Sequence, residues 1–479
     1  MGQSVGTPTP SLSSTNPYAA RCSWGRGDTA DTGCADPWGT YERRGPEDGY
    51  CLHARTIVVR DGAVTWSRLA VGIMSTKGRS GAIATGLGSG CASLSGGISR
   101  TARRLVLLVG SNPLPNYLAA VALGARQTVL LHSPETEEPC ERLKAVFRAR
   151  GIDVSKRVIQ DATDARQIRD ACRSLDAVDH LHYSGGTKPM AAHVRMALQL
   201  EEHQASYLDE RRGLLRFDDG YDLDLSGLDL GLTLERILEL HGIERVAAHN
   251  PSMSGVPTEE DASALADRVL RYPSTAKALY CRFRPEGRMR SLTQARGDPW
   301  NPADQGLSLS ASQVPGDDWS KDRYEAWVEF LTGRWLERWT ATQIRGLVGD
   351  TCAVQVGVHC KRTKPKSAQF EIDVALIRRQ RLYVLSCTTD ATKSQCKSKL
   401  FEVAMRARQM GGDLARSGLV CLLDGDDADG PYIDQVRADI ASLWDASNVP
   451  KAFGLADLRE WAGIAGEPNL ASLWEWLES

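Results

Sequence analysis

Leu105-Val106-Leu107-Leu108-Val109 leads directly into Gly110-Ser111-Asn112-Pro113, and this junction carries the clearest structural signal in the 479-residue chain. An uninterrupted apolar run of this length, ended by turn-forming residues, is typical of a strand that is buried on both faces of a parallel sheet. Helical periodicity begins at Asn116 and continues to Ala125. We therefore predict a strand, a tight turn and a helix, which together form the repeating unit of an open α/β fold.

The same alternation of strands and helices continues to residue 217. Further strands are expected at 128–131, 157–159 and 178–183, helices at 135–150, at 165–175 and up to Leu200, and a closing hairpin at 205–208 and 214–217. Strands that alternate with helices indicate parallel βαβ units. Residues 103–221 are therefore predicted to form a Rossmann-like, doubly wound sheet.

The rest of the chain is interpreted as four further segments. Residues 1–102 are a low-complexity extension that we expect to be disordered, with Met74 as an alternative start. Residues 222–320 are expected to be a connector with short helices. Residues 321–430 follow the order helix, hairpin strands, strand, helix, which is typical of a restriction-endonuclease-like α/β domain. Residues 431–479 are expected to form a helical tail.

The composition is that of a soluble globular protein, with 42% apolar residues and a formal net charge of −2. This balance excludes a histone-like polycation, so any contact with nucleic acid must be local. No apolar run reaches the length of a membrane span and no secretory signal opens the chain, so we predict a cytoplasmic protein without a membrane partner. The twelve cysteines include no C-x-x-C pair, which argues against zinc and against a disulfide framework.

Ser184-Gly185-Gly186-Thr187-Lys188 lies between the end of a predicted strand and the start of the next helix. In an open α/β sheet, ligands bind at the carboxyl ends of the strands, and a helix N-terminus presents free N–H groups to an anion. The two glycines let the backbone approach a phosphate, while Thr187 and Lys188 add a hydroxyl and a charge. The alternative is an ordinary tight turn with a solvated lysine. The polar loop at Ser111 and Asn112 leaves the first strand at the same expected edge, which favours the phosphate site.

These two loops, Gly110-Ser111-Asn112 and His182-Tyr183-Ser184-Gly185-Gly186-Thr187-Lys188-Pro189-Met190, resemble those of the CRISPR-associated Rossmann-fold (CARF) domain of type III antiviral effectors. The resemblance covers residues 103–218. It implies that the loops bind cyclic oligoadenylate, usually across the two-fold axis of a homodimer. It further implies that Ser111 and Asn112 contact the ligand and that a phosphate is held by Gly185, Gly186, Thr187 and Lys188.

The segment 321–430 resembles the PD-(D/E)xK nuclease that is joined to CARF domains in this family. The matching elements are Gly333-Arg334-Trp335-Leu336-Glu337, Glu371-Ile372-Asp373-Val374, Lys399-Leu400-Phe401-Glu402 and Gly411-Gly412. The resemblance implies that Glu337 and Asp373 are catalytic and hold Mg²⁺ or Mn²⁺, which acidifies a water and stabilises charge on the scissile phosphate. Glu371 and Asp373 stand two apart on a strand and are expected to share one face. Taken alone, each acid has the alternative of a solvated surface residue.

The sequence departs from the nuclease pattern where the family has E-x-K and this chain has Ser386-Cys387-Thr388. Ser386 replaces the second metal carboxylate and Thr388 replaces the catalytic lysine, so we expect a loss of many powers of ten in rate. Lys393, Lys397 and Lys399 follow within a short stretch and are candidates for a migrated catalytic lysine. A weak or altered nuclease and an inactive scaffold both stay open on this evidence.

Residues 356–410 hold a local surplus of positive charge, with twelve Lys or Arg against four Asp or Glu. Such a patch attracts the phosphate backbone of DNA or RNA with strong salt dependence and little sequence preference. A solvated helix face with a basic turn is the alternative.

Three functions are compatible with these patterns. The leading prediction is a homodimeric antiviral effector that senses cyclic oligoadenylate and carries a metal-dependent nuclease-like domain for DNA or RNA. The second is a catalytically inactive CARF-domain regulator or nucleic-acid-binding protein, which Ser386 and Thr388 support. The third is a nucleotide-dependent Rossmann enzyme, which is weakened because the chain has no G-x-G-x-x-G motif and no ribose-binding acid at the usual distance from one.

Overall fold

The computed structural model describes residues 100–175, 177–246, 255–307, 319–363, 368–444 and 448–479, together with the short strands β1 (Val59–Arg60) and β2 (Ala63–Val64). Most of the predicted low-complexity extension, Met74 included, lies outside the described residues. The chain divides into one unit over residues 1–93 and a second unit over residues 94–479. The two large sheets both belong to the second unit.

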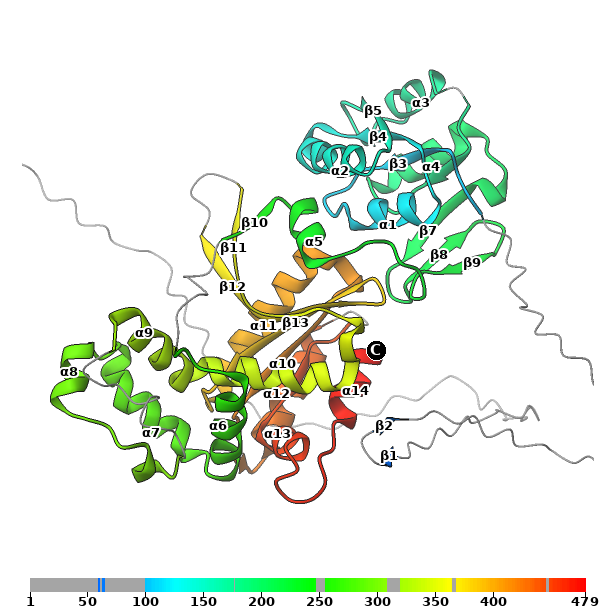
Figure 1. Ribbon diagram of the computed structural model, residues 1–479. Helices are drawn as coiled ribbons and strands as arrows, with labels where there is room; N and C mark the ends of the chain where they lie inside the picture. The colour runs from blue at the N-terminus through cyan, green and yellow to red at the C-terminus, as the bar shows by residue number, and fades with distance from the viewer. Residues whose placement is uncertain are drawn as a thin grey trace, which may run out of the picture. The chain divides into compact units, whose positions relative to one another are not determined.

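The Rossmann-like domain is built on a seven-stranded sheet in the order β5-β4-β3-β6-β7-β8-β9 (Figure 1). β3 to β7 run parallel to one another, and β8 and β9 extend the β7 edge in antiparallel fashion. The doubly wound α/β sheet predicted from the sequence is confirmed. Its strands are β3 (Arg104–Leu108), β4 (Gln127–His132), β5 (Asp153–Val158), β6 (His180–His182), β7 (Ala205–Asp209), β8 (Leu214–Phe217) and β9 (Asp222–Asp224).

Helices cover both faces of this sheet because its central strand is apolar on both sides. Leu105, Leu107 and Val109 belong to the cluster that packs with α1 and α2. Val106 and Leu108 belong to the cluster that packs with α3 and α4. The uninterrupted apolar run therefore forms the predicted strand, with alternate residues buried on opposite faces of the sheet. The four helices are α1 (Leu114–Ala122), α2 (Glu137–Ala149), α3 (Ala165–Arg173) and α4 (Lys188–Leu198).

The C-terminal domain is built on a six-stranded sheet in the order β10-β11-β12-β13-β14-β17. β10 to β13 are antiparallel, and β13, β14 and β17 are parallel. Helix α10 (Trp335–Val348) packs on one face of this sheet and α11 (Lys393–Gly411) on the other. The strands are β10 (Ile243–Arg245), β11 (Val354–Arg362), β12 (Gln369–Arg378), β13 (Arg381–Thr388), β14 (Arg416–Cys421) and β17 (Lys451–Phe453), and a separate short hairpin pairs β15 (Asp426–Asp427) with β16 (Gly430–Pro431).

The C-terminal sheet extends beyond the segment 321–430 to which the sequence analysis assigned it. β10 comes from the predicted connector and pairs with β11, while β17 comes from the predicted helical tail and pairs with β14. Both strands have only three residues, too few to show a strand pattern in the sequence. The tail otherwise forms α12 (Tyr432–Leu443), α13 (Leu455–Trp461) and α14 (Ala471–Glu478).

The predicted connector is also more helical than its Gly and Pro content suggested. α5 (Leu234–Leu240) precedes β10, and three later helices of the connector, together with one from the start of the segment 321–430, pack with α10 in one apolar cluster rich in tryptophan. A π-helical turn, Phe330–Arg334, joins the last of them to α10. These four helices are α6 (Glu259–Arg271), α7 (Ser274–Phe283), α8 (Leu292–Gly297) and α9 (Lys321–Glu329).

Candidate functional site

The two glycine loops of the Rossmann-like domain meet at the carboxyl edge of its sheet. β3 and β6 are neighbouring parallel strands, so the loops that follow them leave the same edge. A Cβ atom on Gly110 would lie 3.1 Å from the backbone nitrogen of Gly186, and one on Gly185 would collide with the carbonyl oxygen of Leu108. Gly186 also has a positive φ of 71°. Glycine is therefore required for this close approach.

Several groups suited to bind an anion are left open at this edge. Ser111 and Lys188 are exposed, and neither forms a hydrogen bond or an ion pair with another described residue. Within the described residues, the backbone N–H groups of Gly185 and Gly186 also donate to no acceptor. They stand before the N-terminus of α4, where the helix dipole favours negative charge. The arrangement fits a phosphate.

Two predicted ligand residues are instead engaged within the protein. The Thr187 hydroxyl accepts a hydrogen bond from Met190 N at 3.2 Å and donates one to Ala162 O at 2.8 Å, so it caps α4. The Asn112 side-chain oxygen accepts from Leu114 N at 3.1 Å and lies 3.2 Å from Nε2 of His241. Neither contact was visible in the sequence, and ligand contact by Thr187 and Asn112 stays a prediction.

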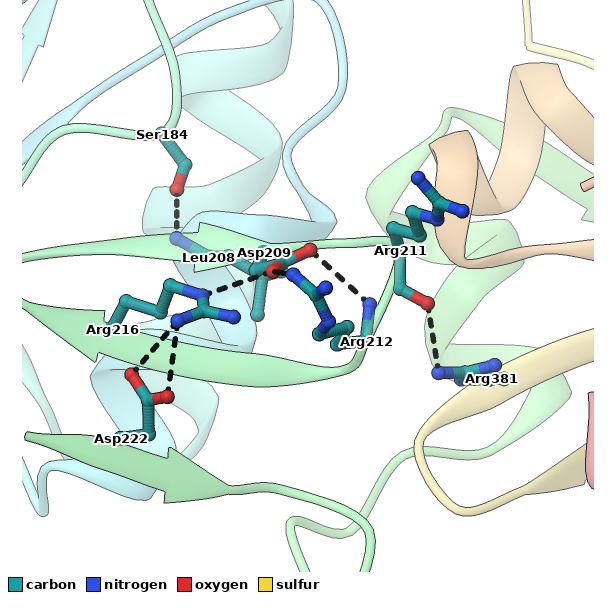
Figure 2. Close-up of polar contacts among 8 residues, drawn as sticks. All are labelled: Ser184, Leu208, Asp209, Arg211, Arg212, Arg216, Asp222 and Arg381. Carbon is teal, nitrogen blue, oxygen red and sulfur yellow. Dashed lines mark hydrogen bonds and ion pairs between the residues drawn. The ribbon is translucent and has the colours of Figure 1, made fainter. Parts of the chain in front are cut away.

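The second glycine loop is also tied to the β7–β8 hairpin. The backbone N–H of Leu208 on β7 donates to Oγ of Ser184, as Figure 2 shows. At the tip of the hairpin, the carbonyl oxygen of Arg211 accepts a hydrogen bond of 3.2 Å from Arg381, the first residue of β13 (Figure 2). The ligand loop is thus connected through one hairpin to the C-terminal domain.

In the C-terminal domain, Asp373 on β12 lies in a cavity of about 260 Å³ together with Glu371, Ser386 and Lys399. The Asp373 Oδ2 atom accepts a hydrogen bond of 2.9 Å from Ser386 Oγ and one of 2.6 Å from Cys387 N. Burial raises the pKa of the Asp373 carboxyl, an effect that these two hydrogen bonds oppose. Glu371 and Asp373 share one face, as their spacing predicted.

Glu337 approaches the same carboxylates from α10. Its side chain is buried, with 9% of its surface exposed, and forms no hydrogen bond or ion pair with another described residue. Burial and the neighbouring charges of Asp373 and Glu371 raise the pKa of Glu337 well above its usual value. Glu371 itself lies 3.5 Å from both Arg334 and His359. The structure thus brings Glu337 close enough to Asp373 for the two charges to interact, and both residues were predicted to act together.

The donor set fits a hard divalent cation in part. Two buried carboxylates that repel each other, Glu337 and Asp373, are oxygen ligands of the kind that Mg²⁺ and Mn²⁺ prefer, and Mg²⁺ is often held by two carboxylates plus phosphate and water. Among the described residues, no cluster of three His, Cys, Asp or Glu side chains is arranged to hold a metal ion. Ser386 stands where the E-x-K motif of the family has a metal carboxylate, and it instead donates a hydrogen bond to Asp373.

The three candidate lysines of α11 lie on two faces of the helix. Lys393 lies 3.8 Å from Asp427 and also contacts Gln435, while Lys397 forms an ion pair of 2.9 Å with Asp439. Lys399 lines the cavity of Asp373, and its charge opposes the rise in the pKa of that carboxyl. Within the described residues, Lys399 forms no hydrogen bond or ion pair. The structure therefore places Lys399, rather than Lys393 or Lys397, beside the carboxylates.

The positive surplus of residues 356–410 is largely balanced inside the protein. Arg378 and Arg379 each form an ion pair of 2.6 Å with Glu478, and Arg381 donates to the backbone oxygens of Arg211 and Ser479. Lys364 and Lys366 lie outside the described residues. Four more of the twelve basic residues, in addition to Lys393 and Lys397, take part in paired contacts: Lys361, Arg362, Arg406 and Arg408.

The C-terminal domain matches a known protein family. Residues 324–431 match the family model described as Card1-like, endonuclease domain. No curated protein sequence matches the chain. In the parts of the chain that the structure describes, no helix combines the length and apolar character needed to span a bilayer.

Two solved structures, VC1899 and Can2, share this fold over 78% of the chain. Protein VC1899 from Vibrio cholerae aligns at 15% identity over 78% of this chain and 98% of its own, with a TM-score of 0.56. Can2 from Sulfobacillus thermosulfidooxidans, in complex with cyclic tetra-adenylate, aligns at 15% identity over 78% of this chain and 99% of its own, with a TM-score of 0.55. A type III CRISPR defence DNA nuclease activated by cyclic oligoadenylate aligns at 21% identity over 67% of this chain and 46% of its own, with a TM-score of 0.43.

Proposed function

We propose that this chain, a CARF-like Rossmann domain joined to a Card1-like endonuclease domain, senses cyclic oligoadenylate and acts on nucleic acid as a homodimeric antiviral effector. The observation that carries the proposal is the convergence of the two glycine loops, with open backbone N–H groups, an exposed Ser111 and an unpaired Lys188 at one sheet edge. A protein of the same fold, Can2, is bound to cyclic tetra-adenylate.

The sensing role depends on phosphate recognition by backbone and by one lysine. Unpaired N–H groups at a helix N-terminus bind a phosphate without any change in the fold, and Lys188 adds a charge-assisted contact. In a homodimer the two copies of each loop would surround one cyclic ligand. Calorimetry of the full chain with cyclic tetra- and hexa-adenylate tests this role, and sedimentation tests the dimer. A folded protein that binds neither ligand would contradict the proposal.

The effector role depends on Glu337, Asp373 and Lys399. Glu337 and Asp373 would hold Mg²⁺ or Mn²⁺, which when bound neutralises developing charge on a phosphodiester and acidifies water. Ser386 and the Cys387 N–H fix the orientation of the Asp373 carboxylate. Lys399, which also lines the cavity, would donate hydrogen bonds to the phosphate and stabilise its transition-state charge, the task that Thr388 cannot perform.

A second candidate function is a regulator that binds the cyclic ligand or nucleic acid and cuts nothing. The hydrogen bond from Ser386 to Asp373 favours it, because the position of a metal carboxylate has become a neutral partner of the remaining one. The two functions are separated by incubating single- and double-stranded DNA and RNA with the protein, Mn²⁺ and cyclic tetra-adenylate. Cleavage that Asp373→Ala abolishes supports the nuclease, and folded, ligand-binding protein without cleavage supports the regulator.

A further inference from the structure

We propose that the 3₁₀ turn Gly412–Leu414, which directly follows α11, is the junction through which the ligand loops control the nuclease cavity. This inference rests on the proposed sensing function and goes beyond it, because it assigns a role to Gly411-Gly412 and to Glu210 that neither phosphate binding nor cleavage requires. Three contacts seat the turn in the Rossmann-like domain, and α11 connects it to the cavity.

The first contact is apolar. Leu414 is 1% exposed and belongs to the buried cluster formed by α1, α2 and one face of the Rossmann-like sheet. A residue of the C-terminal domain is therefore a member of the core of the other domain. Movement of the turn away from this core would expose a leucine side chain to water, at a cost that opposes free sliding of the two domains.

The second contact involves Glu210 at the tip of the β7–β8 hairpin. The backbone N–H of Asp413 donates a hydrogen bond of 2.8 Å to Oε2 of Glu210. Burial raises the pKa of the Glu210 carboxyl. Glu210 lies two residues after Leu208, whose N–H is bound by Ser184 of the ligand loop. A shift of that loop is therefore passed along β7 to the end of α11.

The third contact involves Asn112 of the first ligand loop. Gly412 has a φ of +60°, and a Cβ atom there would collide with Nδ2 of Asn112 and lie 2.5 Å from Oε2 of Glu210. His241 holds the other side of the Asn112 amide at 3.2 Å. The first ligand loop, through Asn112, and the β7–β8 hairpin, through Glu210, therefore reach one glycine of the C-terminal domain. Because of these two neighbours, residue 412 has no room for a side chain.

The other end of the connection is α11 itself. This helix runs from Lys393 to Gly411 without interruption, and its residues Lys399 and Glu402 line the cavity of Asp373. A rigid helix that is held at its C-terminus by Asn112 and by the β7–β8 hairpin, and that presents Lys399 to the cavity, transmits displacement between the two sites. Coupling requires that the cyclic ligand prefer one of two positions of this helix.

Hydrogen exchange of residues 393–411 in the full chain, with and without cyclic tetra-adenylate at a concentration that calorimetry shows to be saturating, tests the junction. In the wild type we expect the ligand to change exchange rates in this helix by fivefold or more, the low end of ordinary allosteric coupling. Gly412→Ala and Glu210→Ala should bind the ligand but reduce that change to less than twofold.

Matched controls separate the junction from general loss of stability. Gly349 ends α10 with φ +60° and ψ −156°, almost the values of Gly412, φ +60° and ψ −146°, but a Cβ atom there would touch nothing within 4 Å. Gly349→Ala therefore imposes the same backbone strain without the contact, and Glu202→Gln removes an exposed carboxylate of the same domain. Both should keep the wild-type response.

The outcomes separate this inference from the function on which it rests. If the wild type binds no cyclic oligoadenylate, the sensing function and the junction both fall. If the ligand binds but leaves α11 unchanged, or if Gly412→Ala responds like Gly349→Ala, only the junction is overturned. Should Gly412→Ala fail to fold, Glu210→Ala decides the question in the same way.

Discussion

The ligand edge of the Rossmann-like sheet and the cavity of the C-terminal sheet use their polar groups in opposite ways. At the ligand edge, Lys188 and the N–H groups of Gly185 and Gly186 are left without partners among the described residues. In the C-terminal domain, Asp373 lines the cavity and is held by Ser386 and by Cys387 N, while Glu337 on α10 is buried beside like charges. One site offers positive groups to an anion, and the other needs a cation to relieve its own repulsion.

This difference shows where an incoming ligand supplies free energy. A phosphate at the glycine loops satisfies groups that the fold leaves open, so binding there needs little rearrangement. A metal ion held by Glu337 and Asp373 would compensate two carboxylates whose charged forms burial disfavours. The ligand edge is preorganised by its backbone, whereas the two carboxylates depend on a bound cation to offset the cost of burying their charges.

The largest expected effect concerns the lysine of the cavity. In a wild type that cleaves nucleic acid with Mn²⁺, Lys399→Ala should lower the cleavage rate by about 10²- to 10³-fold, because one preorganised donor to the transition state is lost. Lys397→Ala, on the same helix but paired with Asp439, should change the rate by less than about twofold, as expected for a solvated ion pair. Single-turnover rates measure both. The reverse ranking would make Lys397, also a candidate from the sequence, the catalytic lysine.

The next effect concerns the open lysine of the ligand edge. Lys188→Ala should weaken the binding of cyclic tetra-adenylate by about hundredfold or more, since a hydrogen bond from a charged group contributes about 1.5–3 kcal/mol and a dimer would lose two of them. Lys144 on α2 forms an ion pair of 2.9 Å with Glu141 and provides the control. Equal affinities of Lys188→Ala and Lys144→Ala in calorimetry would remove the ligand edge from the proposal.

A smaller effect concerns the buried Glu337. Because its pKa is raised in the folded state, the folded protein holds this proton more tightly than the unfolded chain does. The metal-free protein should therefore lose stability as the pH rises from the usual glutamate pKa through the raised one. Glu337→Gln should flatten this decrease, leaving the smaller contributions of Asp373 and Glu210, whose pKa values are also raised.

Thermal unfolding from pH 4.5 to pH 8, with and without Mn²⁺, measures the Glu337 effect. At a concentration of about 100 Kd, Mn²⁺ should stabilise the wild type by about 2.7 kcal/mol and Glu337→Gln by much less. The exposed Glu325 of α9 is the matched control. Identical metal stabilisation of Glu337→Gln and Glu325→Gln would show that the ion binds elsewhere.

The smallest effect concerns the basic hairpin of β12 and β13. Arg379 is paired with Glu478 at 2.6 Å, so Arg379→Ala should change the affinity for DNA or RNA by less than about twofold and leave the salt dependence unaltered, since it contacts no phosphate. Affinities measured over a range of salt concentrations test this. A decrease in the salt slope by about 0.9 would mean that Arg379 does contact a phosphate.

Local patterns were sufficient for the architecture and for part of the ligand edge. The apolar run at Leu105 identified a doubly buried strand, and the helix expected at 135–150 is α2. The glycine loops converge because parallel neighbours end at one edge, a rule that needs no coordinates. The strands β10 and β17 could not be found in this way, because each has three residues and is held only by its neighbours.

Helical geometry limited what could be said about the lysines of α11. Lys393 and Lys397 are four residues apart and share one face of the helix, whereas Lys399 lies about 200° around from Lys397. The sequence thus separates Lys399 from the other two, but it does not tell which face meets Asp373. That choice depends on how α11 packs against β13 and β14, which brings Asp427 and Asp439 to one face and the cavity to the other.

The order of strands and helices, the glycine turns and the missing E-x-K motif could all be read from the chain, because each depends on residues close together in the sequence. Tertiary packing alone decided that Thr187 caps a helix, that Asn112 faces Gly412, and that Arg378 and Arg379 of the basic hairpin pair with Glu478. These pairs join segments that are distant in sequence, or side chains that have several possible partners, so only the folded chain selects among them.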